Sequence, residues 1–342
     1  MSNDNSQIND NRLLVKDVIE LMLALPQLSP VNYFKVDREN VSSQLIFERS
    51  NEVDAGLIRV PGKEEIMVSA TIVMERLLRI SPQAATELAL AQLVRKIYCF
   101  GASFSAYDIV ITNVNMSSPY HMEMVDGIKE GCKRISRKYD IPMSHQKILF
   151  TCDPKTLDQM PSLVLNGLGV LAKENDFVTS RFKTKGNNIY LLGKSIEDTQ
   201  GSLFQKYVLE EKWDSLMRFD LDVEIKLKKV LEGLVSNKLI ETANPLHRGG
   251  LFFSLLRAGY ESGFGFDITT DMAVSPEAFL FGEYLGRVIV SVSPDKDDAF
   301  IDYMTSVNQP FYTLGHVTKG EIRIDDQSYG YIDKDYSDVE PI

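Results

Sequence analysis

The sequence predicts an α/β (α+β) protein built from two units, and three observations support this fold class. Runs of apolar residues at helical spacing alternate with short β-branched runs along most of the chain. Glycine and proline stand between these runs, where they favour turns and helix ends. The chain has 342 residues, which is long enough for two hydrophobic cores. We therefore expect two domains that divide near residue 160.

The first half of the chain contains helix and strand signals in regular alternation. A helical pattern at its start ends at Pro26, which cannot continue a helix. Pro82 opens a long helix, and Gly101 closes it. The predicted helices cover residues 13–25, 83–100 and 120–139, and the predicted strands cover 54–60, 65–71, 109–114, 147–151 and 163–171.

Residues 243–293 are the centre of the second half, because they join a Gly-Gly pair, an apolar helix and a buried strand. Gly249 and Gly250 precede the helix 252–260, and unhindered N–H groups at a helix start favour a phosphate. A simple tight connection is the more common role of such a pair, and that alternative stays open. The remaining predicted strands are 188–192, 287–292, 311–317 and 321–325, and the remaining helices are 201–210, 223–236 and 294–304.

Composition places the chain among ordinary globular proteins, with 44% hydrophobic and 25% charged residues. A formal net charge of −11 without a long basic run disfavours nucleic acid or an anionic membrane as partner. No apolar run approaches the roughly 18 residues that cross a bilayer, and residues 1–12 lack the apolar core of a secretion signal. Cys99, Cys132 and Cys152 have neither disulfide-framework nor zinc spacing. We expect a cytoplasmic protein.

Several short motifs follow one another along the chain. They are LALP at 23–26, DAGLIRV at 54–60, Ser81-Pro82 with Arg95 and Gly101-Ala102, Asn113 with Pro119, YLLG at 190–193, Gly201-Ser202, GGL at 249–251 and LFGE at 280–283. In this order and spacing they resemble the aminoimidazole ribonucleotide synthetase superfamily, and specifically the C-terminal half of formylglycinamidine ribonucleotide synthetase. The resemblance covers about residues 22–324, which is most of the chain.

The resemblance implies an N-terminal sheet that pairs with a second copy to close a barrel, followed by a C-terminal α/β domain. A chain that corresponds to only one half of the long synthetase is then expected to form a homodimer. It also implies ATP or ADP as the nucleotide that such a fold can take. The expected division is a helix and linker at 1–50, the barrel-forming domain at 51–160, the C-terminal domain at 161–325 and a poorly packed acidic tail at 326–342.

The magnesium ligands that the resemblance implies are missing together. The acidic and amide positions correspond to Thr71, Gln92, Lys96, Pro245 and Arg248, and the position of a family histidine corresponds to Asn244; none of these residues is a carboxylate. Magnesium requires oxygen ligands and is repelled by cationic side chains, so we expect no bound magnesium. The candidate cofactor-binding residues are Asp54, Thr71, Gln92, Lys96, Asn113, Asn244, Arg248, Gly249, Gly250 and Glu283.

Lys96 and Arg248 allow two interpretations. They either replace the cation and bind a small phosphate-bearing ligand directly, or they are solvated side chains that pair with nearby carboxylates, which is the more common case. His247 is the one weak candidate for acid–base catalysis, and an ordinary loop histidine is the simpler interpretation. Glu283 keeps the family's place, where a glutamate also serves to cap a helix or pair with a cation.

Three functional hypotheses follow. The first is a degenerate relative of the synthetase that acts as a dimeric binding, regulatory or auxiliary protein linked to purine synthesis. The second is an active ATP-dependent ligase of the formylglycinamidine or aminoimidazole ribonucleotide synthetase type with a shifted site. The third is an interaction subunit that docks on a purine-biosynthesis enzyme. We favour the first, because one missing carboxylate can be replaced by water but a complete loss cannot.

Overall fold

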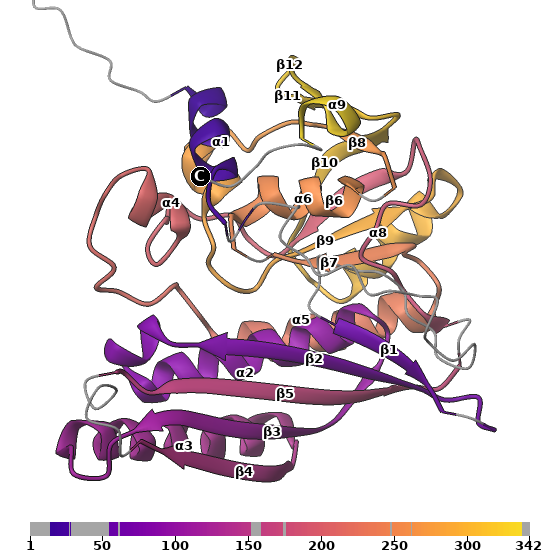
Figure 1. Cartoon of the computed structure of the whole chain (residues 1–342). Coiled ribbons are helices and arrows are strands. Elements are labelled where there is room, and N and C mark those ends of the chain that lie inside the picture. The colour runs from indigo at the N-terminus through magenta and orange to yellow at the C-terminus, as the bar shows by residue number, and fades with distance from the viewer. Residues whose placement is uncertain are drawn as a thin grey trace, which may run out of the picture.

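Two β-sheets, each with its own hydrophobic core, organise the chain (Figure 1). The computed structural model describes residues 14–26, 28, 55–60, 62–151, 159–173, 176–246, 248–260 and 262–336. Strands β1–β5 form sheet A and strands β6–β12 form sheet B. Helices pack against both sheets, so the predicted α/β (α+β) class is confirmed.

Sheet A has the strand order β1-β2-β5-β3-β4, with β3 and β4 parallel and the other neighbours antiparallel. Its strands are β1 (Ala55–Arg59), β2 (Ile66–Met74), β3 (Ser103–Val114), β4 (Met143–Phe150) and β5 (Ser162–Leu171). Because β5 pairs with both β2 and β3, sheet A continues to Leu171 and passes the division expected near residue 160. Strand signals in the sequence do not tell which sheet a strand joins.

The two faces of sheet A differ in what covers them. Along β2, Ala70 and Ile72 are buried in the core that the sheet shares with its helices, whereas Thr71 and Val73 between them are exposed. Figure 1 shows α2 and α3 behind the sheet, and no described helix lies over its front face. Sheet A therefore has one packed face and one open face among the described residues.

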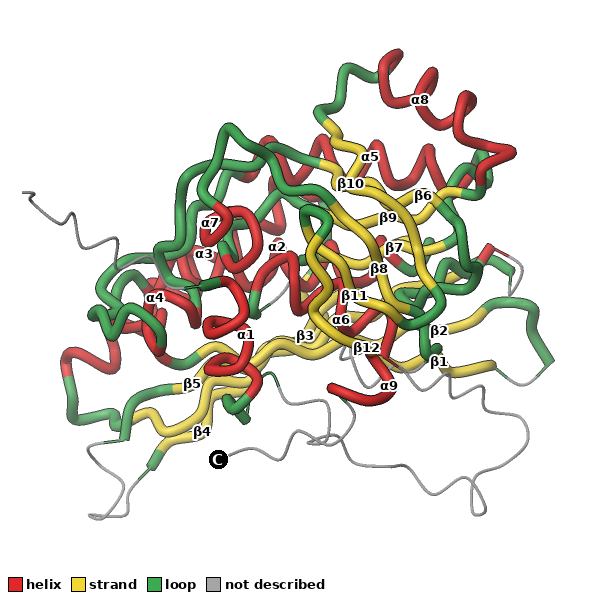
Figure 2. Tube along the Cα trace, turned by 90° about the horizontal axis from the view of Figure 1, so that it is seen from above, coloured by secondary structure: helices red, strands yellow, loops and turns green. Residues whose placement is uncertain are grey.

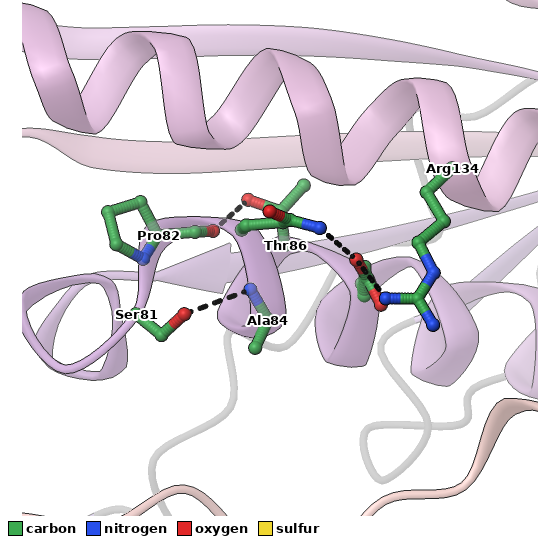
Figure 3. Close-up of polar contacts among 7 residues, drawn as sticks. Ser81, Pro82, Ala84, Thr86 and Arg134 are labelled. Atoms are coloured by element: carbon green, nitrogen blue, oxygen red, sulfur yellow. Dashed lines mark hydrogen bonds and ion pairs between the residues drawn. The ribbon is translucent and has the colours of Figure 1, made fainter.

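Helix α2 (Pro82–Cys99) begins and ends close to where the sequence predicts. Ser81 caps it, because its Oγ accepts a hydrogen bond from the N–H of Ala84 at 3.3 Å (Figure 3). Pro82 stands in the first turn, where its missing N–H costs nothing. Gly101 follows the helix with a φ of +80°, which a glycine adopts without strain.

Helix α2 is buried on nearly all sides and lies between the two units. Sheet A and α3 (Pro119–Tyr139) pack on it from one side, and α5 (Leu221–Ser236) and β7 of the second unit pack on it from the other. Arg134 of α3 reaches the carboxylate of Glu87 on α2 at 3.4 Å (Figure 3). The charged residues Glu87 and Arg95 of this buried helix are accommodated because each has an ion-pair partner.

Sheet B has the strand order β12-β11-β8-β10-β6-β9-β7, and its strands lie side by side in Figure 2. One face packs on α5 and α8, and the other packs on α6 together with α1, α7 and α9. The strands are β6 (Asn188–Leu192), β7 (Thr242–Pro245), β8 (Gly265–Ile268), β9 (Val288–Val292), β10 (Phe311–Thr318), β11 (Glu321–Ile324) and β12 (Gln327–Tyr331). The helices are α1 (Val15–Leu23), α4 (Leu203–Tyr207), α6 (Gly250–Tyr260), α7 (Pro276–Phe281), α8 (Asp297–Ser306) and α9 (Ile332–Asp335).

The segment after Asp326 is packed as far as the structure describes it, which differs from the expected poorly packed tail. Strand β12 pairs with β11, and Ile332 and Tyr336 are buried in the core beneath α6. The acidic composition suggested solvation, but apolar and aromatic residues at intervals supply the packing. None of the helices in the described part of the chain is both long and apolar enough to span a bilayer.

Candidate functional site at the hub turn

The turn between α7 and β9, residues 282–287, contacts several elements of the second unit, and we call it the hub turn. Glu283 in this turn is buried, and its Oε1 accepts two backbone hydrogen bonds. The donors are the N–H of Gly249 at 2.8 Å and the N–H of Leu203 at 2.9 Å. Gly249 precedes α6 and Leu203 begins α4, so one carboxylate joins three loops that are far apart in the sequence.

The start of α4 is built for this contact. Gly201 turns the chain with a φ of +72°, and Ser202 caps the helix by accepting the N–H of Gln205 at 3.0 Å. The N–H of Leu203 then has no partner within the short helix and points to Glu283. The Gly201-Ser202, GGL and LFGE motifs, which the sequence separates, therefore meet at one side chain.

Burial raises the pKa of Glu283 to about 7. The N–H groups of Gly249 and Leu203 and the nearby charges of Arg248 and Arg257 oppose this shift, since they favour the carboxylate. The larger effect is the loss of solvation, because the side chain is almost fully enclosed by protein. Glu283 thus takes up a proton near neutral pH while it holds two loops.

The raised pKa predicts how the stability of this protein depends on pH. The pKa of Glu283 is about 7 in the folded protein and near 4.5 in the unfolded chain. The group therefore contributes its full stabilisation of the folded state below pH 4.5, and this stabilisation is lost as the pH rises through 7. The side chain of the variant Glu283→Gln is neutral at every pH, so it serves as the reference. Between pH 4.5 and pH 7 and above, the free energy of unfolding of the wild type should fall by about 3 kcal/mol relative to that of the variant. Urea unfolding at several pH values measures the difference.

Glu283→Ala is the control for this prediction. It removes the acceptor altogether and leaves two buried N–H groups unpaired, so it should destabilise by about 2–5 kcal/mol throughout the pH range. A constant difference between the wild type and Glu283→Gln at all pH values would show that Glu283 titrates in the folded protein as it does in the unfolded chain.

Three other side chains or backbone groups of the hub turn bind further elements. The hydroxyl of Tyr284 accepts the N–H of Ile196 at 2.9 Å, and the N–H of Leu285 donates to the carbonyl of Arg218 at 3.1 Å. Arg287 is fully buried, and its Nη2 donates to the carbonyl of Gly282 at 2.6 Å. These contacts fix the conformation of the turn that presents Glu283.

Among the described residues, no carboxylate pairs with the guanidinium of Arg287. Its carbon lies 3.7 Å from the ring centre of Tyr284, and its Nη1 contacts the carbonyl of Phe279 at the end of α7. Burial lowers its pKa to about 10, so the group is still charged at neutral pH. The aromatic ring and the carbonyl groups at a helix end are the neutral partners that such a cation accepts.

A buried ion pair connects the hub turn to α2. Glu224 on α5 accepts a hydrogen bond from the N–H of Gly286 and lies 2.6 Å from Nη1 of Arg95. Both side chains of this pair are almost inaccessible, with exposures of 4% for Arg95 and 2% for Glu224. Burial raises the pKa of Glu224, whereas Arg95 and the Gly286 N–H lower it. The pair links the two units through their common interface.

The Gly-Gly turn lies beside Glu283 and opens α6. Gly249 and Gly250 have φ values of +85° and +71°, so both need a conformation that glycine adopts readily. Arg248 before them is exposed, and its carbonyl accepts a hydrogen bond from Nη2 of Arg257 at 3.1 Å. Asn244 is buried on β7, where its Nδ2 contacts carbonyl groups and its Oδ1 lacks a partner in the described residues.

The predicted site residues of the first unit do not gather in one place. Thr71 lies on the open face of sheet A, where its Oγ1 hydrogen-bonds to Oδ1 of Asn166 at 3.0 Å. Gln92 and Lys96 lie on α2, which covers the opposite face, with Gln92 half-buried and Lys96 buried. The sheet therefore separates Thr71 from both. Asn113 ends β3 in a left-handed conformation with a φ of +59°.

Two further candidates, Asp54 and His247, lie outside the described residues. The structure brings together Arg248, Gly249, Gly250 and Glu283 from the predicted set. The donor set does not fit magnesium, because hydroxyl, amide and cationic groups replace the carboxylates. Nor does any group of three or more His, Cys, Asp and Glu side chains in the described ranges form a metal site.

Sequence reasoning missed the buried charges around the hub turn. Glu224 and Arg287 were not candidates, although Arg287 directly precedes the largely apolar run VIVSV that forms β9. A charged residue next to a continuous apolar strand is a signal that a buried cation has local partners. The partners themselves are mostly backbone groups, which a sequence does not reveal.

Comparison with known proteins defines the class to which this fold belongs. Residues 183–326 match the family described as AIR synthase related protein, C-terminal domain. Thermotoga maritima PurL complexed with ADP superposes with a TM-score of 0.68 and 14% identity, covering 85% of this chain and 46% of that chain. Thiamine monophosphate kinase from Aquifex aeolicus gives 0.55 and 14%, covering 77% and 89%. The fold is that of the aminoimidazole ribonucleotide synthetase superfamily, as predicted.

The chain also resembles formylglycinamidine ribonucleotide synthetase in sequence, and that predicted resemblance is confirmed. The phosphoribosylformylglycinamidine synthase subunit PurL of Leuconostoc mesenteroides is 27% identical over 291 residues. The alignment covers 84% of this chain and 38% of that protein. The chain thus spans less than half the length of the curated relatives that it matches.

Proposed function

We propose that this chain is a phosphoribosylformylglycinamidine synthase-related protein with a degenerate magnesium-nucleotide site, and that it serves purine synthesis in the cytoplasm as a binding, regulatory or auxiliary protein. One observation carries the proposal. The positions that correspond to the family's cation ligands hold Thr71, Gln92, Lys96 and Arg248, of which Lys96 is buried and Arg248 is exposed. These side chains supply positive charge where a magnesium ion needs negative charge.

A ligand with a phosphate group suits the start of α6 better than a metal ion does. The helix has eleven residues, and Gly249 and Gly250 at its start are buried, with the N–H of Gly249 bound to Glu283. A phosphate therefore meets this turn from the solvent side, at Arg248. Arg248 stands next to this pair and is exposed, so it can pair with a phosphate oxygen. Protonation of Glu283 removes a nearby negative charge, so such binding should weaken as the pH rises through about 7.

Calorimetric titration with ATP tests the proposed degeneracy. We expect the same affinity in magnesium and in EDTA, because no carboxylate is available to share the ion. Arg248→Gln should weaken binding about tenfold, the effect of one charge-assisted hydrogen bond. The control is Arg137→Gln, an exposed arginine in the last turn of α3. Magnesium-dependent binding followed by turnover of ATP would instead establish an active ligase.

We also propose that a second copy of the chain covers the open face of sheet A. This face carries the exposed Val73 and half-buried aliphatic residues such as Val164 and Leu168 between polar groups. The edge strands β1 and β4 each pair on one side only with a described strand. Apolar surface together with unpaired strand edges favours association.

Introducing a charge on this face should dissociate the homodimer. Val73→Glu places a carboxylate on the open face, at a side chain that is 47% exposed in the single chain. The control is Val223→Glu, which alters a valine of α5 that is 43% exposed. Sedimentation velocity should show a monomer for the first variant and a dimer for the second. If instead the chain is monomeric alone and copurifies with a purine-biosynthesis enzyme, it is an interaction subunit.

A further inference from the structure

A small cavity lies between α2, α3 and α5, away from the Gly-Gly turn. Its polar lining comes from Arg95 and Tyr98 on α2, Tyr139 at the end of α3, and Glu224 and Lys228 on α5, and aliphatic side chains complete the wall. The cavity volume is about 10 Å³. This is about the space that one water-sized group needs, so the cavity is too small for a nucleotide.

The cavity is lined by hydrogen-bond donors that have no acceptor. The Nε of Arg95 is buried and lacks a partner among the described residues, although Nη1 of the same group binds Glu224. Within that part of the chain, the hydroxyl groups of Tyr98 and Tyr139 form no hydrogen bond either. Burial raises the pKa of Tyr139, so its hydroxyl keeps its proton and can donate. Of these donors, Nε of Arg95 is the one that is also closed off from solvent, and a buried donor without an acceptor is rare in folded proteins and calls for a bound group.

The residues that line the cavity carry two cations and one carboxylate. Arg95 and Lys228 contribute two cations, and Lys228 lies 4.7 Å from the ring centre of Tyr98. Glu224 is the carboxylate in the lining, and it is already engaged by Arg95 and by the N–H of Gly286. Glu232 also lies 3.8 Å from Lys228, but this pair is partly exposed to solvent and screened.

We propose that this cavity binds a single small anion of chloride size, held by Arg95, Tyr98, Tyr139 and Lys228. Such an ion accepts several hydrogen bonds at once and compensates the excess positive charge of the lining. It joins the helices of the first unit, α2 and α3, to α5 of the second. The bound ion therefore stabilises the interface that also contains the Arg95–Glu224 pair.

Thermal unfolding in sodium chloride and in sodium gluconate at equal concentration tests the proposal. At ten times its dissociation constant, chloride should raise the midpoint by on the order of 2 °C over gluconate. The double variant Tyr98→Phe with Tyr139→Phe keeps both rings and should lose this difference. Tyr120→Phe, which alters an exposed tyrosine of α3, should keep it.

Crystals of the wild type grown in sodium bromide provide a second measurement that does not depend on any variant. The anomalous signal of bromine should lie in the cavity, within hydrogen-bond distance of Nε of Arg95. Equal midpoints in the two salts, or a water molecule in place of bromide in the crystals, would overturn the proposal.

Discussion

Glu224→Gln should lower the free energy of unfolding by about 3–5 kcal/mol, the cost of removing one partner from a buried ion pair. The carboxylate lies 2.6 Å from Nη1 of Arg95, and both side chains are almost inaccessible to solvent. The variant leaves the buried cation of Arg95 without its carboxylate partner. Urea unfolding followed by the fluorescence of Trp213, the one tryptophan of the chain, measures the loss.

The control for this prediction is an exposed ion pair on the same helix. Asp222 lies 3.2 Å from Lys138, and the two side chains are 81% and 49% exposed. Asp222→Asn should therefore cost no more than about 1 kcal/mol. The double variant Arg95→Met with Glu224→Gln should recover part of the loss, because it removes the uncompensated charge as well. Equal losses for Glu224→Gln and Asp222→Asn would contradict the buried pair.

Gly250→Ala should destabilise the protein by about 3–5 kcal/mol, for two reasons that add. Its φ of +71° costs an alanine about 1–2 kcal/mol. A Cβ at this position would also lie 2.7 Å from the carbonyl oxygen of Leu280 and 2.7 Å from the carbonyl carbon of Phe281. Both are backbone atoms at the end of α7, so relief requires a movement of the hub turn and adds about 1–3 kcal/mol.

Gly263→Ala is the matched control, because it separates backbone conformation from packing. Gly263 has nearly the same φ, +70°, but a Cβ there meets no atom within 4 Å. The change should cost about 1 kcal/mol, since the conformational strain is partly offset by the reduced freedom of the unfolded chain. The same loss for both variants in thermal or urea unfolding would show that α7 does not pack tightly on the start of α6.

Regular elements with strong local signals could be predicted from the sequence. The bounds of α2 follow from a proline at its start and a glycine after its end, and β6 follows from an apolar run between turns. The sheet to which a strand belongs could not be predicted in this way. Strand β5 joins sheet A because its pairing partners are β2 and β3, which are distant in sequence.

Residues of the candidate site that belong to a family motif could be predicted from the sequence. Contacts of these residues with backbone atoms could not be predicted. Glu283 and Gly249 were both candidates, yet the hydrogen bond between them depends on how α6 and the hub turn pack. Arg95 and Glu224 are 129 residues apart in the sequence, and no local sequence pattern indicates that they pair. Thr71 shows the opposite case, because alternation along β2 places it on the face that α2 does not cover.

Diffraction from crystals grown with ADP and manganese tests the central claim most directly, because manganese replaces magnesium and scatters anomalously. The proposed loss of carboxylates at Thr71, Gln92, Lys96 and Arg248 predicts no manganese peak coordinated by protein oxygens between α2 and the Gly-Gly turn. A manganese ion held there by side-chain oxygens of this chain would contradict the claim that the cation site is degenerate.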